Sequence, residues 1–266
     1  MRFTPSEESW ILITGASAGI GEVFAKRFAD RGNHLVLVAR SIDKLQTLAK
    51  HLETSYHIQT LTIEADLAKD DLPKKVFGKV NQQNIELYGL INNAGCGASG
   101  KFADVTLDRY LNMIDLNIRS LVELTHLFLP GMIKRKKGFI LNVSSMASFQ
   151  PLPYSSVYSA SKAFVTFFSE ALWLETKNTG VRILNLCPGL TKTNFGKAAG
   201  IRDFHNDPIA ESPERVVETA LRALNKNMPT VISGWHNKFL VLLERFIPHR
   251  ILLWASLVVQ DNRRII

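Results

Sequence analysis

The chain has 266 residues, enough for one large α/β domain, and no Ser-, Gly- or Pro-rich linker divides it in two. A hydrophobic content of 46% and a charged content of 21% exclude a mainly disordered chain, and a count of two cysteines excludes a disulfide scaffold. The formal net charge of +8 suits an anionic ligand such as a phosphorylated cofactor. Because no nucleic-acid motif and no metal-ligand spacing accompany this charge, we expect one domain over residues 1–266 that binds neither nucleic acid nor metal.

Short apolar runs alternate with helical patterns along most of the chain. Strands are expected over residues 9–14, 34–39, 59–63, 87–92, 139–143, 182–187 and 230–232. Several of these runs are apolar throughout, as buried parallel strands are. With right-handed βαβ crossovers, the pattern predicts a Rossmann-type, doubly wound parallel sheet of about seven strands, with helices on both faces and a ligand crevice at the carboxyl ends of the strands.

A glycine-rich turn follows the first expected strand. Its glycines, Gly15, Gly19 and Gly21, are spaced G-x-x-x-G-x-G, and a helix with a stripe of apolar side chains follows, ending near Gly32. Glycines at a strand-to-helix turn let the backbone approach a pyrophosphate, while the helix amides meet its charge. The turn therefore predicts a dinucleotide site, although a turn that is glycine-rich by chance is the alternative.

Tyr158 and Lys162 are four residues apart in a helical pattern. Side chains at this spacing lie on the same helix face, so the lysine charge would favour the phenolate and lower a tyrosine pKa that is ordinarily about 10. The pair therefore predicts a proton-transfer site. Together with the glycine-rich turn, it indicates hydride chemistry on a bound dinucleotide.

These features resemble the short-chain dehydrogenase/reductase family, and the resemblance covers nearly the whole chain. Beyond the motif from Thr14 to Gly21, the matching residues in chain order are Asp66-Leu67, Asn92-Asn93-Ala94-Gly95, Asn117, Ser144-Ser145, Tyr158 with Lys162, and Pro188-Gly189. The resemblance implies cofactor contacts from Gly15, Ser17, Gly19, Ile20 and Gly21 in the turn, from Asp66 and Leu67 beside the adenine, from Asn93, Ala94 and Gly95 below the cofactor, and from Pro188, Gly189, Thr191 and Thr193 at the nicotinamide amide.

The end of the second strand indicates which cofactor is used. Family members that use NAD usually place an acidic residue there, whereas this chain has Ala39 followed by Arg40 and Ser41. The Arg40 guanidinium can pair with a 2′-phosphate, with Ser17 or Ser41 assisting, which favours NADP(H). A solvated charge at a strand end is the alternative for Arg40.

The family's catalytic tetrad corresponds here to Asn117, Ser145, Tyr158 and Lys162. By this resemblance Tyr158 is the acid or base, Ser145 donates a hydrogen bond to the substrate carbonyl, and Lys162 holds the nicotinamide ribose and lowers the tyrosine pKa. Asn117 would hold a water that links Lys162 to solvent. Its alternative role is to satisfy backbone groups at a helix irregularity.

Three other residues compete for these roles. Ser144 adjoins Ser145, but the family's serine lies thirteen residues before the tyrosine, which selects Ser145. Tyr154 has no lysine four residues later. Cys96 lies beside the cofactor segment, yet no histidine is near it in sequence, so a passive thiol is favoured over a nucleophile.

Residues 96–102, 146–154 and 190–211 are expected to shape the substrate pocket, the last as a lid. The apolar composition of the second segment favours an apolar ketone or aldehyde that is interconverted with its alcohol. A 3-oxoacyl thioester is the rival substrate, since a basic surface could receive an acidic carrier. A non-catalytic NADP(H)-binding regulatory protein is the alternative from a different functional class.

Two apolar regions predict contacts beyond the domain. The Tyr158 helix is apolar on more than one face, which predicts a homodimer or homotetramer, with coverage by the C-terminal helices as the alternative. Residues 235–260 read as two short apolar helices, interrupted by charges and a proline, that pack on the domain, on a partner subunit or on a membrane surface. The first ten residues lack the apolar run of a secretory signal, so a cytoplasmic location is expected.

Overall fold

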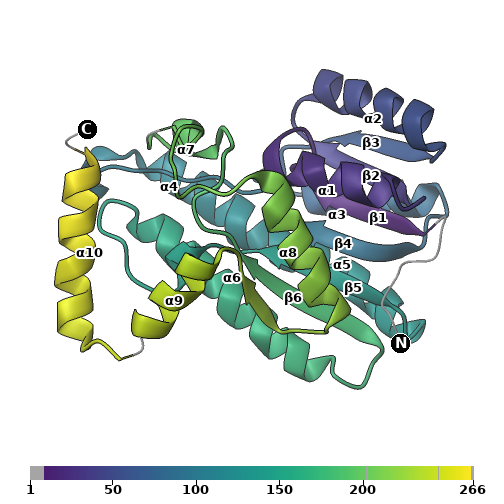
Figure 1. Cartoon of the computed structure of the whole chain (residues 1–266). Helices are drawn as coiled ribbons and strands as arrows, with labels where there is room; N and C mark the ends of the chain where they lie inside the picture. Colours follow the sequence, from purple (N-terminus) through teal and green to yellow (C-terminus); the bar gives the residue numbers. More distant parts are fainter. Residues whose placement is uncertain (1–8, 202, 245, 265–266) are drawn as a thin grey trace.

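A seven-stranded parallel sheet forms the centre of the computed structural model, which describes residues 9–201, 203–244 and 246–264 (Figure 1). The strand order is β3-β2-β1-β4-β5-β6-β7, so the order reverses between β1 and β4. The strands are β1 (Trp10–Thr14), β2 (His34–Ala39), β3 (Thr60–Glu64), β4 (Leu87–Asn92), β5 (Gly138–Val143), β6 (Val181–Cys187) and β7 (Thr230–Ile232). This confirms the predicted sheet, with every strand within one residue of its expected bounds.

Helices cover both faces of the sheet, which explains why β4 and β5 are buried at every residue. One apolar cluster joins the sheet to α1 (Gly19–Ala29), α2 (Ile42–Tyr56) and α8 (Pro213–Asn225). The other joins it to α3 (Leu72–Gln82), α5 (Ser120–Lys134) and the end of α6 (Ser156–Glu175). The apolar stripe of α1 is confirmed, with Phe24 and Phe28 fully buried, although the helix ends at Ala29 and Gly32 (φ 75°) lies in the turn beyond it.

Shorter helices lie at the carboxyl end of the sheet. They are the 3₁₀ turns η1 (Phe102–Asp104) and η3 (Met146–Ser148), α4 (Leu107–Ile114), the π-helical turn η2 (Asp115–Arg119), and α7 (Phe195–Ala198). After β7 the chain continues into two helices, α9 (Trp235–Glu244) and α10 (His249–Arg264), which we call the C-terminal hairpin (Figure 1). Among the described residues, no helix combines the length and apolarity needed to cross a bilayer.

A row of asparagines crosses the middle of the sheet. Asn92, Asn142 and Asn185 stand opposite one another in the register of β4, β5 and β6, and all three are buried. The Asn92 amide donates to Asn142 Oδ1 (2.9 Å), and the Asn142 amide donates to Ser169 Oγ of α6 (2.9 Å). Because unpaired buried amides are costly, these bonds fix both the strand register and the position of α6, the helix that carries Tyr158.

Replacing Asn142 by alanine should therefore destabilise the fold. Asn142→Ala leaves the Asn92 amide without one acceptor and opens a cavity beside Ser169, so we expect a loss of about 2–4 kcal/mol in the free energy of unfolding. Denaturant titration followed by circular dichroism measures this loss. Asn81→Ala, at an exposed asparagine of α3, is the control and should change the free energy by less than about 0.5 kcal/mol. Equal effects of the two substitutions would contradict the role given to the asparagine row.

Candidate active site

The glycine-rich turn is held by hydrogen bonds between the ends of β1 and β4. Thr14 Oγ1 accepts hydrogen bonds from the backbone amides of Asn93 and Ala94, both at 2.9 Å. The Asn93 side-chain amide donates in return to the carbonyl oxygens of Thr14 (2.8 Å) and Gly15 (3.3 Å). Gly15 has a φ of 65°, and a Cβ at this position would lie 2.9 Å from Asn93 Nδ2, so both conformation and space require glycine.

A cleft opens at this point, where the strand order reverses, as expected for a doubly wound sheet. Eight of the predicted cofactor residues line it: Gly15, Ser17, Arg40, Ser41, Asp66, Leu67, Ala94 and Gly95. Sequence reasoning did not assign the other five lining residues to the cofactor: Val38, Ala39, Ala65, Cys96 and Leu116. Three of these, Ala39, Ala65 and Cys96, directly precede or follow a predicted cofactor residue, and Leu116 precedes the predicted catalytic Asn117. Their places beside these residues were the signal that could have found them.

The remaining predicted cofactor residues surround this cleft without lining it. Gly19, Ile20 and Gly21 begin α1, and Gly21 packs against the carbonyl of Gly15. The segment from Pro188 to Thr193 follows β6 and approaches the turn, since a Cβ built on Gly19 would lie 3.1 Å from the Thr193 methyl group. Within the segment, the Thr191 hydroxyl donates to the Gly189 carbonyl (3.0 Å).

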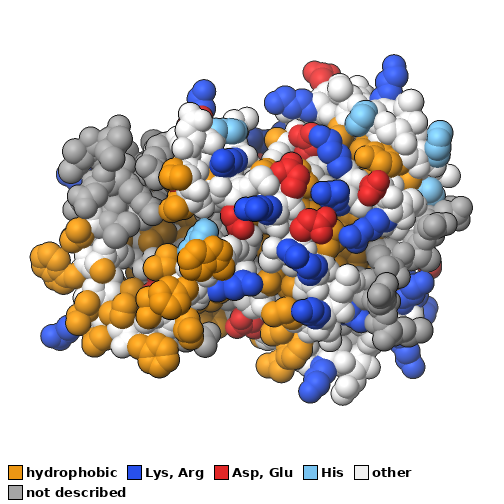
Figure 2. All heavy atoms as spheres, viewed as in Figure 1, with side chains coloured by type: hydrophobic (Ala, Val, Ile, Leu, Met, Phe, Trp, Pro, Cys, Tyr) orange, Lys and Arg blue, Asp and Glu red, His pale blue; other side chains and the backbone are white. Residues whose placement is uncertain are grey.

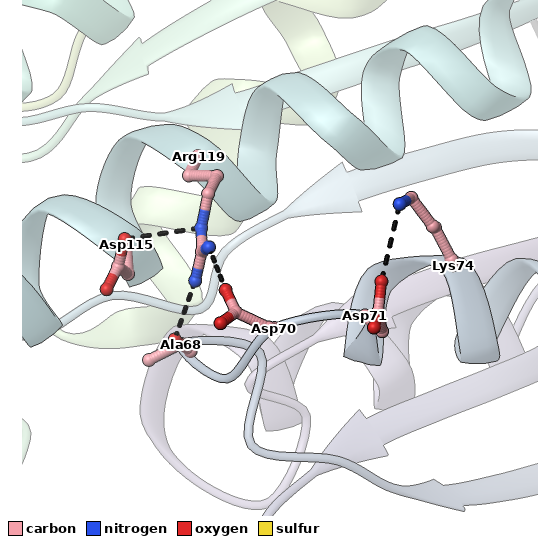
Figure 3. A network of polar contacts seen from close by, with 6 residues as sticks. All are labelled: Ala68, Asp70, Asp71, Lys74, Asp115 and Arg119. Carbon is pink, nitrogen blue, oxygen red and sulfur yellow. Dashed lines mark hydrogen bonds and ion pairs between the residues drawn. The ribbon is translucent and has the colours of Figure 1, made fainter.

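The loop after β3 is fixed by Arg119, at the end of the π-helical turn (Figure 3). Its guanidinium pairs with Asp70 and with Asp115 (3.2 Å), and it donates to the carbonyl oxygen of Ala68 (3.0 Å). These groups are partly exposed, so each ion pair contributes little alone. Their combined geometry holds the stretch that begins with Asp66 and Leu67 against η2.

The two neighbouring serines after β5 have different environments. Ser144 is buried, and its hydroxyl donates to the Lys162 carbonyl (2.8 Å) and contacts Thr166 Oγ1 (2.9 Å). Ser145 is only half-buried, and its hydroxyl accepts from the Ala147 amide (3.1 Å) and hydrogen-bonds Tyr158. The structure therefore brings Ser145, the predicted serine, to the tyrosine, while Ser144 anchors α6.

Tyr158 and Lys162 lie together, but burial governs their ionisation. The Lys162 ammonium is 5.9 Å from the centre of the Tyr158 ring and donates to the Val143 carbonyl (2.9 Å). Burial raises the pKa of Tyr158 to about 12, although the Ser145 hydrogen bond opposes this, and burial lowers the pKa of Lys162 to about 8. The tyrosine pKa is thus shifted opposite to the direction expected from the spacing, because desolvation of the phenol outweighs the influence of the lysine in this arrangement.

Asn117 lies within the π-helical turn, a feature that often marks functional sites. Its side chain donates to the Cys96 carbonyl and to Ser161 Oγ, and accepts from the Cys96 amide, each at 3.0 Å. A Cβ on Gly95 would lie 3.2 Å from Asn117 Oδ1 and 3.3 Å from Lys162 Nζ, so the carboxamide lies close to the ammonium. Asn117 itself lies at a helix irregularity, but the backbone groups that its side chain satisfies are those of Cys96, in the loop after β4.

Cys96 has the properties of a passive thiol. Burial raises its pKa, although the nearby charges of Lys162 and Arg40 partly offset the shift. Its backbone is held on both sides by Asn117, which fixes the path of the chain between the cleft and α4. A neutral thiol at this position agrees with the expectation that Cys96 is not a nucleophile.

Residues 190–211, the predicted lid, lie over Tyr158. Phe195 of α7 places its ring 5.7 Å from the tyrosine ring, and the Ala199 carbonyl accepts from the Ser99 amide (3.0 Å). A parallel bridge between Thr191 and Glu211 joins the two ends of the segment. The sequence gave no sign that Phe195 would be the residue against the tyrosine ring.

Two supporting residues escaped sequence reasoning altogether. Ser161 receives the Asn117 amide, and the Asn237 side chain of α9 packs against Gly189. Ser161 directly precedes Lys162, so its place in the motif was a usable signal, whereas Asn237 lies in a separate helix and had none. The assembled site joins the crevice at the strand-order reversal to the partly buried phenol of Tyr158, the half-buried hydroxyl of Ser145 and the buried ammonium of Lys162.

Comparison with known protein families and relatives gives consistent matches. The short chain dehydrogenase family model matches residues 9–202. The very-long-chain 3-oxoacyl-CoA reductase of Mus musculus is 36% identical over 261 residues, which cover 95% of this chain and 81% of the mouse protein. The corresponding protein of Homo sapiens is 36% identical over 224 residues, which cover 83% of this chain and 70% of the human one.

Solved structures also resemble this chain. A short-chain dehydrogenase from Sphingobium yanoikuyae in complex with NADPH is 34% identical, with a TM-score of 0.81, and the match covers 86% of this chain and 88% of that protein. The bulky-bulky ketone specific alcohol dehydrogenase from Comamonas testosteroni is 28% identical, with a TM-score of 0.78 and coverages of 96% and 93%. The fold of the site is thus shared with a short-chain dehydrogenase and an alcohol dehydrogenase of known structure.

The cost of the buried ammonium should be measurable in the isolated protein. The pKa of Lys162 falls from 10.5 when unfolded to about 8 when folded, so the unfolded state binds more protons between these values and stability rises with pH across that window. Below about pH 8 Lys162 is protonated in both the folded and the unfolded state, so the full cost of burying the ammonium remains. Lys162→Met should therefore raise the free energy of unfolding by about 1–3 kcal/mol at about pH 7, and this advantage should shrink by about 1–2 kcal/mol at about pH 9.5.

Denaturant unfolding at the two pH values tests this expectation. Tyr158, whose pKa rises from 10.0 to about 12, affects stability only above about pH 10 and does not interfere. Lys177→Met, at an exposed lysine just beyond α6, is the matched control and should change stability by less than about 0.5 kcal/mol. A Lys162→Met protein that is less stable than the wild type at both pH values would show that burial of the ammonium carries no such cost.

Proposed function

The chain belongs to the short-chain dehydrogenase/reductase family of oxidoreductases, and we propose that it uses NADPH to reduce the keto group of an apolar 3-oxoacyl thioester. The observation that carries the proposal is the placement of Tyr158 and Ser145, joined by a hydrogen bond, beneath Phe195 and beside a crevice of the dinucleotide-binding type. Such a site presents a proton donor and a hydrogen-bond donor to one carbonyl oxygen.

The protonation state of Tyr158 supports the reducing direction. A pKa of about 12 keeps the phenol protonated at neutral pH, which is the form needed by a proton donor. The crevice residues, among them Gly15, Ser17 and Arg40, would hold NADPH, which would supply the hydride. Tyr158 then donates its proton to the carbonyl oxygen, Ser145 donates a hydrogen bond to the same oxygen, and the Lys162 ammonium stabilises the phenolate that remains. Asn117, beside this ammonium, would position the water that returns a proton to it.

The cofactor proposal rests on the crevice residues after β2. Ala39 provides no carboxylate for an adenosine ribose, while Arg40, Ser41 and Ser17 all line the crevice. A guanidinium with neighbouring hydroxyls matches a 2′-phosphate in charge and in hydrogen-bond donors. The similarity to a short-chain dehydrogenase in complex with NADPH points the same way.

The substrate proposal rests on the relatives and on the apolar surroundings of the tyrosine. The sequence alone favoured a simple ketone or aldehyde, but relatives of 36% identity are named very-long-chain 3-oxoacyl-CoA reductases, which favours the thioester. Phe195 lies against the Tyr158 ring, and half-buried Met146 directly follows Ser145 in the chain. A bulky ketone is the second candidate, because a bulky-bulky ketone specific alcohol dehydrogenase shares the fold at a TM-score of 0.78.

We also infer that the protein acts as a homo-oligomer, with α6 at the subunit contact. This helix exposes Phe164, Phe167 and Leu174 at 39%, 73% and 64% of their surfaces while its other side packs on the sheet. Exposed apolar side chains on a helix that also carries the catalytic tyrosine are suited to a symmetric contact that steadies the site.

Turnover with a substrate panel tests the function. Wild-type protein should consume NADPH faster with long-chain 3-oxoacyl-CoA than with short-chain 3-oxoacyl-CoA or with bulky ketones, followed by the loss of NADPH absorbance. Tyr158→Phe should lower kcat by at least about 10²–10⁴-fold while leaving NADPH affinity within about threefold, because only the proton donor is removed.

Tyr56→Phe, at the end of α2 and away from the crevice, is the matched control and should retain wild-type turnover. Equal activity of wild type and Tyr158→Phe would refute the catalytic assignment. Faster turnover of bulky ketones than of every 3-oxoacyl-CoA would instead establish the second candidate.

Cofactor preference should depend on Arg40. Arg40→Ala should raise the Kd for NADPH by about 10–100-fold and change the Kd for NADH by less than about threefold, because a charge-assisted contact to the 2′-phosphate is lost. Isothermal titration or ligand-linked thermal shift measures both constants. Arg31→Ala, at an exposed arginine between α1 and β2, is the control. An equal loss of affinity for NADPH and NADH would show that Arg40 does not bind the 2′-phosphate.

A further inference from the structure

The C-terminal hairpin of α9 and α10 exposes apolar side chains to an unusual extent. Trp235, Phe246 and Trp254 have 78%, 79% and 72% of their surfaces exposed, although they are among the largest apolar residues of the chain. In Figure 2 hydrophobic side chains gather over this end of the molecule, whereas charged side chains dominate the end formed by α1 and α2. Large apolar patches on a protein surface mark interaction sites.

The exposed residues follow helical periodicity and point outward. On α9 the exposed stripe includes Phe239 and Leu242 and continues to Phe246, while on α10 it includes Ile251 and Trp254. Only Val241 of α9 is buried among its apolar side chains. We call the outward stripes of the two helices the hairpin surface. The apolar side chains of these two helices are exposed, whereas the apolar side chains of α1 are buried against the sheet.

The charges around this surface have one sign. Among the described side chains from 235 to 258, those that are exposed and basic are Lys238, His249 and Arg250. The acidic Glu244 is half-buried, one of its carboxylate oxygens is enclosed, and burial raises its pKa. The exposed rim of the hairpin surface is therefore cationic.

We propose that the hairpin surface docks onto the surface of an anionic lipid membrane. Tryptophan and phenylalanine side chains flanked by cations suit the boundary between acyl chains and negatively charged headgroups. A second copy of the chain fits less well, because a symmetric contact between two such surfaces would bring like charges together. Neither helix of the hairpin is long and apolar enough to cross the bilayer, so the hairpin lies on it.

The hairpin is mounted on the catalytic end of the molecule. The Asn237 amide donates to the Ser233 carbonyl (2.6 Å) and packs against Gly189, while the Ser233 hydroxyl donates to Glu211 at the end of the lid. The docked face and the covered tyrosine thus belong to the same end of the sheet (Figure 1). If the proposed function holds, an apolar acyl substrate held in the bilayer meets the protein at the end that carries its site.

Vesicle co-sedimentation of the full chain tests the docking. Wild-type protein should sediment with phosphatidylcholine vesicles that contain phosphatidylserine, and less with pure phosphatidylcholine or at high salt. Leu242→Glu, at a leucine 52% exposed on the hairpin surface, should reduce the partition coefficient at least about tenfold. Ile133→Glu, at an isoleucine 36% exposed near the end of α5, is the matched control and should leave it unchanged.

A charge variant separates the two contributions. Lys238→Glu combined with Arg250→Glu should weaken binding to the anionic vesicles at least about tenfold and leave the weak binding to pure phosphatidylcholine unaltered. Circular dichroism and the Tm establish that each variant is folded, and turnover of a short-chain 3-oxoacyl-CoA in Leu242→Glu should match the wild type. If the protein and its variants show no turnover of 3-oxoacyl-CoA while vesicle binding is intact, the proposed function is refuted, but the docking proposal is not.

Three results would overturn the proposal. The first is a wild-type protein that remains wholly in the supernatant with anionic vesicles, and the second is an equal loss of binding in Leu242→Glu and Ile133→Glu. A Leu242→Glu protein that changes from a larger to a smaller oligomer, with a wild type that ignores vesicles, would assign the hairpin surface to contact between copies of the chain.

Discussion

The hydrogen bonds between Thr14 and the stretch from Asn93 to Ala94 are the constraint on which the site depends. In a doubly wound sheet the helices on either side of the reversal leave toward opposite faces, so a gap at this edge follows from topology. These bonds fix how wide that gap is, because they join the ends of β1 and β4 by side chain and backbone together. They also require glycine at position 15, because a Cβ added there would displace the Asn93 side-chain amide.

The second determinant is the low polarity around the proton-transfer groups. The partly buried phenol of Tyr158 and the buried ammonium of Lys162 both resist carrying charge, which raises the pKa of the tyrosine and lowers the pKa of the lysine. The arrangement favours a neutral tyrosine, which gives up its proton only when negative charge develops on the substrate oxygen and makes the transfer favourable. The asparagine row contributes indirectly, since the Asn142 amide fixes α6, the helix on which both groups reside.

The sequence predicted well what depends on local pattern and poorly what depends on packing. Apolar runs located all seven strands, and glycine spacing located the turn, because backbone geometry dictates both. The Tyr158 pKa is shifted in the direction opposite to the expected one, because spacing reveals the neighbouring charge but not the burial of the phenol. Asn142 and Asn237 act across long separations in the chain, so nothing in their immediate neighbours could reveal them.

The bridge between Thr191 and Glu211 places the two ends of the intervening segment side by side on the body of the protein. The chain thus leaves and rejoins the framework at nearly one place. Because the entropy of closing a loop grows only slowly with its length, this excursion can be shortened, extended or replaced during evolution at little cost to the sheet. Changes in this segment can therefore alter selectivity among carbonyl compounds, while the catalytic residues and the sheet below it stay the same.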